Sequence, residues 1–173
     1  MYTQLKIFRE ERNLEHSPGF IVANITDENK ELQIEILNNN ELGMICELAD
    51  HVIYAINAIE ATGHDAQSNI ECINNYDSQL LDDPSPNRAV SCILIALASY
   101  NLEKDVKALA LIAKIALNAI GSLGYYAERC VLEKCKTINS RKGSHNYEVG
   151  KWQKDPHQDP STIYQPQYAS CKK

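Results

Sequence analysis

The chain of 173 residues carries a formal net charge of −6, and 44% of its residues are hydrophobic. This length allows one compact core, or two small units that share a core. The acidic balance argues against a nucleic-acid polymer as a partner, because phosphate backbones select basic surfaces. Leu, Ile, Ala, Asn, Glu and Lys dominate while valines and aromatic clusters are scarce, and this composition favours an all-α fold.

Signals for secretion or membrane insertion are weak in this sequence. The segment from Met1 to His16 lacks the apolar core of a secretory signal. The most apolar stretch, Ala108 to Ile120, is interrupted by Lys114 and Asn118 and falls short of the roughly 18 residues that a membrane helix needs. The six cysteines form no CxxC pair. We therefore expect a cytoplasmic protein with reduced thiols and no membrane partner.

Apolar residues at three- and four-residue spacing predict a series of helices. The predicted helices span residues 18–37, 41–61, 66–81, 88–100, 102–120 and 126–138. Ser17 is placed to cap the first of them, and Gly63 stops the second. The segment Asp-Asp-Pro-Ser-Pro-Asn at 82–87 is the strongest break in the first half of the chain.

An internal repeat divides the helical part of the chain. The sequence Ala55–Ile59 followed by Gly63 recurs as Ala116–Ile120 followed by Gly124, and the offset is the same for both elements. We interpret this as an internally duplicated helical hairpin, and coincidence between two helices rich in Ala and Ile is the alternative. The same offset from Glu47 and Asp50 leads to an Ala and a Leu, so the second copy lacks these acids.

The sequence thus predicts a single all-α domain over residues 1–173 with three parts. Residues 16–81 form an acid-bearing half and residues 86–139 a second, structural half. Residues 140–173 are rich in Gly, Pro and polar side chains, and this composition predicts an extended tail that forms a surface loop or clasp.

Two pairs of acids occur in the first half, Glu28-x-x-Glu31 and Glu47-x-x-Asp50. The spacing puts both members of a pair on one helix face, so two antiparallel helices aim four carboxylates at one spot. Such anions repel unless hard cations lie between them, and Mg²⁺ is the expected ion, with Mn²⁺ as a substitute. The second pair interrupts an apolar stretch, where burial is costly without a partner. A solvated helix start is the alternative for the first pair.

With fifteen residues between its two pairs, this pattern resembles the ExxE…ExxD signature of the all-α NTP pyrophosphohydrolase superfamily. That superfamily includes MazG, the phosphoribosyl-ATP pyrophosphohydrolases and the dimeric dUTPases. Residues 131–143 and 150–155 are also similar to the closing helix and tail of MazG-like proteins that bacteriophages often encode. The resemblance covers residues 16–168 except about 66–104, and it implies a MazG-like helical bundle.

The resemblance implies hydrolysis of a (d)NTP to the (d)NMP and pyrophosphate. One branch, the MazZ type, has a similar layout and acts on dGTP, so dGTP or GTP is the first expectation and dUTP or damaged nucleotides come next. The four acids would hold the metal, with Glu31 or Glu47 as general base. Relatives form dimers or tetramers, which implies a homo-oligomer, although the second half of this chain can replace one neighbour and leave a monomer.

Under this resemblance Lys136, Asn139 and Arg141, on and just after the last helix, would bind the phosphates. Guanidinium in particular matches the paired oxygens of a phosphate. Cations near a helix C-terminus also complement its dipole, an effect worth about 0.3–1 kcal/mol each. For Lys134 and Lys142 that effect is the simpler interpretation.

Four further residues are candidates for contact with the substrate. Lys151 and Lys154 in the tail would close over it, and Trp152 would either stack on a base or anchor the tail. Asn57 lies seven residues after Asp50 and would read a base, hold a sugar hydroxyl or make a structural hydrogen bond between helices. His51 points to another face and is interpreted as a surface or packing residue.

Two other functions compete with the enzyme. A non-catalytic nucleotide-binding or regulatory module would keep the fold without turnover. A helical interaction protein would carry the acid pairs merely as surface charge. A dUTPase-like enzyme that cleans the nucleotide pool is a variant of the first hypothesis.

Overall fold

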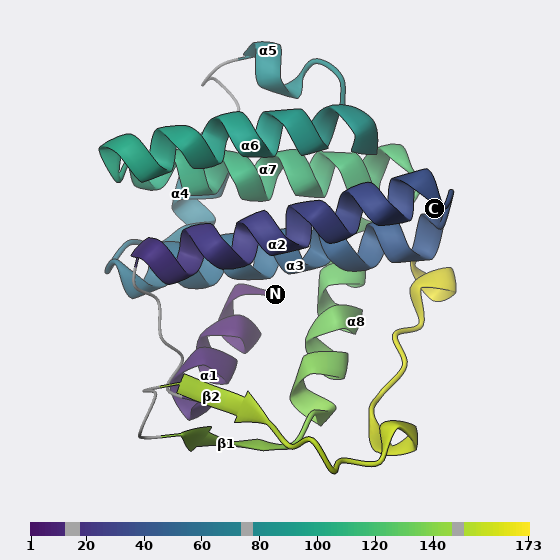
Figure 1. Cartoon of the computed structure of the whole chain (residues 1–173). Helices are drawn as coiled ribbons and strands as arrows, with labels where there is room; N and C mark the ends of the chain where they lie inside the picture. The colour runs from purple at the N-terminus through teal and green to yellow at the C-terminus, as the bar shows by residue number, and fades with distance from the viewer. Residues whose placement is uncertain (13–17, 74–77, 147–150) are drawn as a thin grey trace.

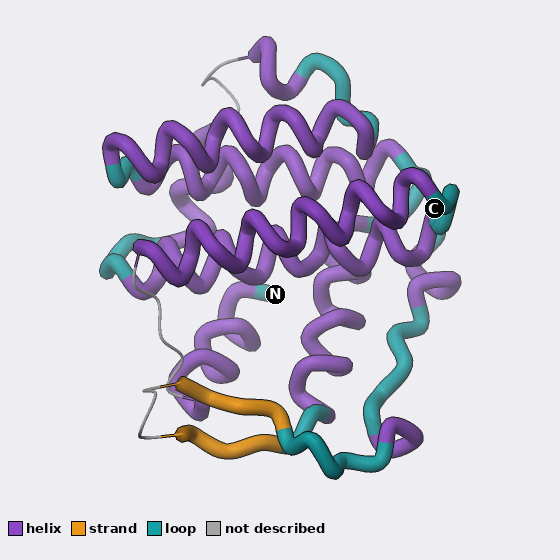
Figure 2. Tube along the Cα trace, in the orientation of Figure 1, coloured by secondary structure: helices purple, strands orange, loops and turns teal. Residues whose placement is uncertain are grey.

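The computed structural model describes residues 1–12, 18–73, 78–146 and 151–173, and helices account for most of them (Figures 1 and 2). The helices are α1 Tyr2–Arg12, α2 Pro18–Leu37, α3 Glu41–Ala61, α4 Ala66–Cys72, α5 Ser78–Leu81, α6 Pro86–Glu103, α7 Val106–Ser122 and α8 Ala127–Ser140. Strands β1 Gly143–Asn146 and β2 Lys151–Lys154 follow, with short 3-10 helices η2 Pro160–Thr162 and η3 Tyr168–Cys171. The predicted all-α character is confirmed, with one small hairpin added.

Four long helices form the body of the molecule (Figure 1). α2 packs on α3, α6 packs on α7, and α3 and α7 lie against each other at the centre. α3 is buried around most of its circumference between Leu48 and Ile59, as expected of a helix inside a bundle. Each large aliphatic side chain buried in this way contributes about 1.5–3 kcal/mol.

α3, rather than the stretch at 108–120, is the one described helix whose length and composition are sufficient to cross a membrane. Most of its apolar window is buried inside the bundle, which is the usual environment of a core helix in a soluble protein. The helix also carries Glu47 and Asp50. Its apolar character is therefore accounted for by packing.

The ends of α3 and α7, and the starts of the helices that follow them, match at the offset of the sequence repeat. α3 and α7 are followed by Gly63 and Gly124, which have φ angles of +82° and +88°. Glycine adopts this left-handed conformation without steric cost. α4 then starts at Ala66 and α8 at Ala127. Each of these helices packs mainly on the opposite hairpin, α4 on α7 and α8 on α3, so each hairpin is braced by a helix of the other.

Several helix bounds differ from the predicted ones. The predicted helix at 66–81 is interrupted, since α4 ends at Cys72 and α5 begins at Ser78. The predicted start of a helix at residue 102 is wrong because α6 continues to Glu103. Lys104 then adopts a φ of +55°, and the Asp105 carboxylate caps α7 by accepting a hydrogen bond from the Lys107 N–H at 2.9 Å.

The N-terminal part of the chain adds a helix to the predicted ones. α1 was not predicted, and Leu5 and Phe8 bury its inner face. α2 begins at Pro18 as predicted. The predicted cap, Ser17, lies outside the described residues.

The tail forms a β-hairpin and then a strap, which we define as residues 155–173. In the hairpin Gly143 pairs with Lys154, and the strap returns beside α8 toward the start of α3 (Figure 1). Glu133 on α8 holds the strap by accepting hydrogen bonds from the Tyr164 hydroxyl at 2.6 Å and the Gln167 N–H at 2.8 Å. Burial favours the protonated form of this carboxyl, yet these donors and Lys136 together lower the pKa of Glu133.

We predict that Glu133→Ala loosens the strap. The substitution leaves the Tyr164 hydroxyl and the Gln167 N–H without their charged acceptor, and such losses cost about 3 kcal/mol of unfolding free energy. Urea unfolding measures this loss, and amide hydrogen exchange should accelerate over residues 164–171. Glu128→Ala, which removes an exposed acid from the first turn of the same helix, should cost less than about 1 kcal/mol. Equal effects of the two substitutions would contradict this assignment.

Candidate metal centre

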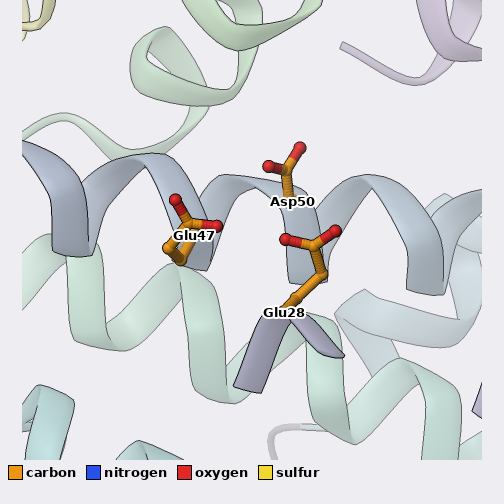
Figure 3. A group of neighbouring side chains, drawn as sticks. All are labelled: Glu28, Glu47 and Asp50. Carbon is orange, nitrogen blue, oxygen red and sulfur yellow. The ribbon is translucent and has the colours of Figure 1, made fainter. Parts of the chain in front are cut away.

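Three of the four predicted acids come together between α2 and α3. Glu28 is on α2, Glu47 and Asp50 are on α3, and one carboxylate oxygen from each lies within 4.8 Å of the others. Figure 3 shows the three side chains turned toward one shared space. All three residues are only partly accessible to solvent. Glu31, one turn after Glu28, is exposed and stands outside this group of three.

The cluster reduces its own repulsion by keeping a proton. Burial, followed by the charge of Asp50, raises the pKa of Glu28 from about 4.5 to about 9. The protonated Glu28 carboxyl donates a hydrogen bond to Glu47. Burial also raises the pKa of Glu47. Without a bound cation, therefore, at least one of the three carboxyls is neutral near pH 7.

Lys134 of α8 completes the cluster, and its assignment as a helix-dipole cation is wrong. Its ammonium group forms an ion pair with the Asp50 carboxylate and donates a hydrogen bond to the Cys46 Sγ at 2.9 Å. The side chain is only 6% exposed, so solvent does not stabilise the charge. Burial lowers the pKa of Lys134, but the contacts with Asp50 and Cys46 outweigh it and raise the pKa above its usual value.

Asp50 experiences opposing effects in this pair. Its side chain is 14% exposed, and burial raises its pKa. The Lys134 ammonium and, after it, the Arg141 guanidinium act in the opposite direction. A buried carboxylate stays ionised only with such partners, and breaking a buried pair on one side typically costs about 3–5 kcal/mol.

Two predicted substrate-binding cations, Arg141 and Lys154, lie within electrostatic reach of the acids. Arg141, the half-buried residue at the C-terminal end of α8, carries a charge that opposes the rise in the pKa of Asp50 caused by burial. Lys154 ends strand β2. Burial and the charge of Arg141 lower the pKa of Lys154, and Asp50 and Glu28 oppose them. The hairpin therefore brings Lys154 toward the cluster.

The other two predicted phosphate ligands on α8 are exposed. Lys136 is exposed and pairs with Glu133, with its Nζ 5.7 Å from the centre of the Tyr164 ring. Its described contacts thus face the strap rather than the acids. Asn139 is exposed near the end of the helix.

The remaining predicted residues are either buried in the core or have side chains outside the described part of the structure. Asn57 is only 2% exposed, and its Oδ1 has no hydrogen-bond partner in the described part of the chain, so it belongs to the core. His51 is fully buried and is a packing residue, and its Nδ1 donates to the Glu47 carbonyl at 2.7 Å. Lys151 and Trp152 are in β2, but their side chains lie outside the described part of the structure.

Sequence reasoning missed three residues of the site: Cys46, Tyr54 and Lys134. Burial, and then the charges of Glu28 and Asp50, raise the pKa of Tyr54, which places its phenol beside the acids. A signal for Lys134 was present in the sequence. Lys134 falls on the same helix face as Cys130 and Val131, at i+4 and i+3, and both of these are fully buried.

The corresponding positions of the second half hold small or apolar residues. The repeat offset, applied to the four acids, leads to Ala89, Cys92, Ala108 and Leu111, and all four are buried. The position matching Lys134 in the first half is Ile73, also buried. The second half is thus packed with apolar side chains where the first half carries charge.

Comparison of the chain with protein-family models, curated proteins and solved structures finds no match. The chemistry of the site is therefore inferred from its own residues.

The donor set fits a hard divalent cation. Three carboxylates meet within 4.8 Å, and oxygen donors are the ligands that Mg²⁺ and Mn²⁺ accept in proteins. Glu28 retains a proton that a cation would displace. Lys134 forms an ion pair with one of the three acids, Asp50. A further positive charge at the site would therefore be stabilised by the other carboxylates.

We predict that the metal-free protein loses stability as pH rises from about 5 to about 9. Over this range the folded state keeps the proton of Glu28, whose pKa is about 9, whereas the unfolded chain has lost it. Glu28→Gln mimics the protonated carboxyl and should flatten this dependence. Urea unfolding at several pH values with a chelator present measures it, and an unchanged slope in the variant would contradict the assignment. Binding of Mg²⁺ should release a proton, so its affinity should rise with pH over the same range.

Proposed function

We propose that the chain is a magnesium-dependent nucleoside triphosphate pyrophosphohydrolase that converts a (d)NTP and water to the (d)NMP and pyrophosphate. The observation that carries this proposal is the acid cluster of Glu28, Glu47 and Asp50, accompanied by the cations Lys134, Arg141 and Lys154. A binding site for a metal and a polyphosphate needs both kinds of charge in one place.

The arrangement suits a triphosphate better than a simple anion. Acids alone repel phosphate, and a divalent cation between them converts that repulsion into attraction. Arg141 and Lys154 would then neutralise the phosphate oxygens that the metal does not reach. Arg141 precedes the β-hairpin and Lys154 ends it, so in this proposal the tail would act as the clasp predicted from its composition.

A bound Mg²⁺ would supply Lewis acidity and lower the pKa of an attacking water. Of the two candidates for the general base, Glu31 is the better placed, since Glu47 is engaged by the Glu28 carboxyl. Glu31 is exposed to solvent, and its charge raises the pKa of Asp50, which places it near the cluster.

We further propose a MazG-like bundle that arose by duplication of a hairpin. This is supported by the common offset of the helix ends at Gly63 and Gly124 and by the crossed packing of α4 and α8. One chain would then contain one site and one supporting half. Homo-oligomers remain part of the proposal, with a dimer or tetramer expected from the resemblance.

The first substrate to test is dGTP, with GTP second, because the layout is similar to the MazZ branch. We predict Mg²⁺-dependent release of pyrophosphate and the monophosphate from at least one member of a panel of NTPs and dNTPs. The products are identified by anion-exchange chromatography. Glu47→Gln and Asp50→Asn should each reduce turnover by at least about a hundredfold, because each removes a metal ligand. Glu31→Gln tests the base.

Asp27→Asn is the matched control for these substitutions. Asp27 is adjacent to Glu28 but 67% exposed and paired with Lys30, so its loss should leave turnover within about twofold. Binding of nucleotide with Mg²⁺ but without turnover would favour a regulatory module. Neither binding nor turnover would favour a helical interaction protein, and full activity of both Glu47→Gln and Asp50→Asn would remove the metal assignment.

A further inference from the structure

The Asp50 carboxylate takes part in two interactions that compete with each other. It belongs to the group of three acids whose oxygens lie within 4.8 Å, and it is also the ion-pair partner of Lys134. If a metal ion binds to Asp50, the carboxylate must either contact the ion and the Lys134 ammonium together or lose its contact with the ammonium. Lys134 is buried, so its charge remains close to the cluster instead of being dispersed in solvent.

The influence of Lys134 extends beyond Asp50. Its positive charge also acts on the pKa of Glu47, opposing the effect of burial, so the ammonium is near two of the three acids. Two positive charges that share this low-dielectric space repel more strongly than they would in water. A divalent cation entering the cluster therefore meets repulsion from Lys134 and competition for Asp50.

We infer that Lys134 is an internal competitor of the divalent cation, holding Asp50 in the metal-free site and turning to the phosphates when metal and nucleotide arrive together. This rests on the metal site of the proposed function. Lys134 thereby keeps the affinity for free metal low and makes tight metal binding depend on nucleotide. It is a positioning residue for the metal.

A purely structural role for Lys134 leads to the opposite expectation. If the ammonium only fastened α8 to α3, its removal would loosen the cluster and weaken the binding of metal. Competition instead means that removal of Lys134 strengthens the binding of metal while nucleotide hydrolysis falls. The sign of the change in metal affinity separates the two roles.

The test is a titration of the full chain with Mn²⁺ alone, followed by the electron paramagnetic resonance signal of free Mn²⁺. Lys134→Met keeps the length and apolar stem of the side chain but removes its charge. We expect its Kd for Mn²⁺ to fall about tenfold or more relative to the unsubstituted protein. The matched control is Lys136→Met, which removes an ammonium two residues away that pairs with Glu133, and its Kd should be unchanged.

Lys134→Gln provides a second variant in case Lys134→Met does not fold, because its amide can still donate to Asp50. If a variant is unfolded in chelator, recovery of its helical circular dichroism signal on addition of Mn²⁺ replaces the direct titration, since binding to the folded state stabilises it. An unchanged or higher Kd in both variants, or no recovery, would overturn the inference. Absence of Mn²⁺ binding by both variants would overturn it as well.

The outcome can be separated from that of the proposed function. Tighter Mn²⁺ binding by Lys134→Met, lost again on adding Glu47→Gln, supports the inference even if no nucleotide is hydrolysed by the unsubstituted protein. Turnover of a nucleotide without tighter Mn²⁺ binding in the variants supports the enzyme and removes the competitor role. A further expected result is that the unsubstituted protein binds Mn²⁺ more tightly when a non-hydrolysable triphosphate is present, and this difference should shrink in Lys134→Met.

Discussion

The positions of α8 and of the tail depend on the ion pair between Asp50 on α3 and Lys134 on α8. Neither charge is stable alone in the interior of the protein. The pair fixes α8 against the acid-bearing hairpin and so fixes where the chain leaves that helix, at Arg141. The β-hairpin and the strap follow from this point. The strap is anchored by Glu133, the neighbour of Lys134 in the sequence, so consecutive residues of α8 serve the tail and the acid cluster.

The two halves of the chain differ in the side chains that they bury at matching positions of α3 and α7. The positions that carry Glu47 and Asp50 on α3 are matched on α7 by Ala108 and Leu111, which are buried. Apolar side chains at these positions contribute to the core, whereas buried acids oppose folding unless they are protonated or paired. The proposed duplication explains how one chain contains an acid-bearing half and an apolar half. Because α4 packs on α7 and α8 packs on α3, neither half is expected to fold without the other.

Helix bounds and the position of the acids could be predicted from the sequence where local signals are strong. The bounds of α3 were predicted from its apolar stripe and from the glycine after it, and the structure adds Asn40 as its N-cap. The meeting of Glu28 with Glu47 and Asp50 followed from spacing on two adjacent helices. Lys134 was not found, because a lysine beside a glutamate in the second half of a helix has an ordinary explanation and its partner Asp50 is distant in the sequence. The β-hairpin was also missed, since Gly143–Asn146 lacks alternating apolar residues.

The contact between Cys46 and Lys134 spans 88 residues, and the nearby pair with Asp50 is almost as distant along the chain. During synthesis from the N-terminus, α2 and α3 are complete well before α8 leaves the ribosome. Until α8 emerges, the acids lack the ammonium group of Lys134, and in that interval protons can neutralise them. The hydrogen bond from Glu28 to Glu47 reduces repulsion between the acids in the folded protein, and it can do the same in the α2–α3 hairpin before α8 is made. Synthesis from the N-terminus thus exposes the acids to protons before they meet the lysine that pairs with Asp50.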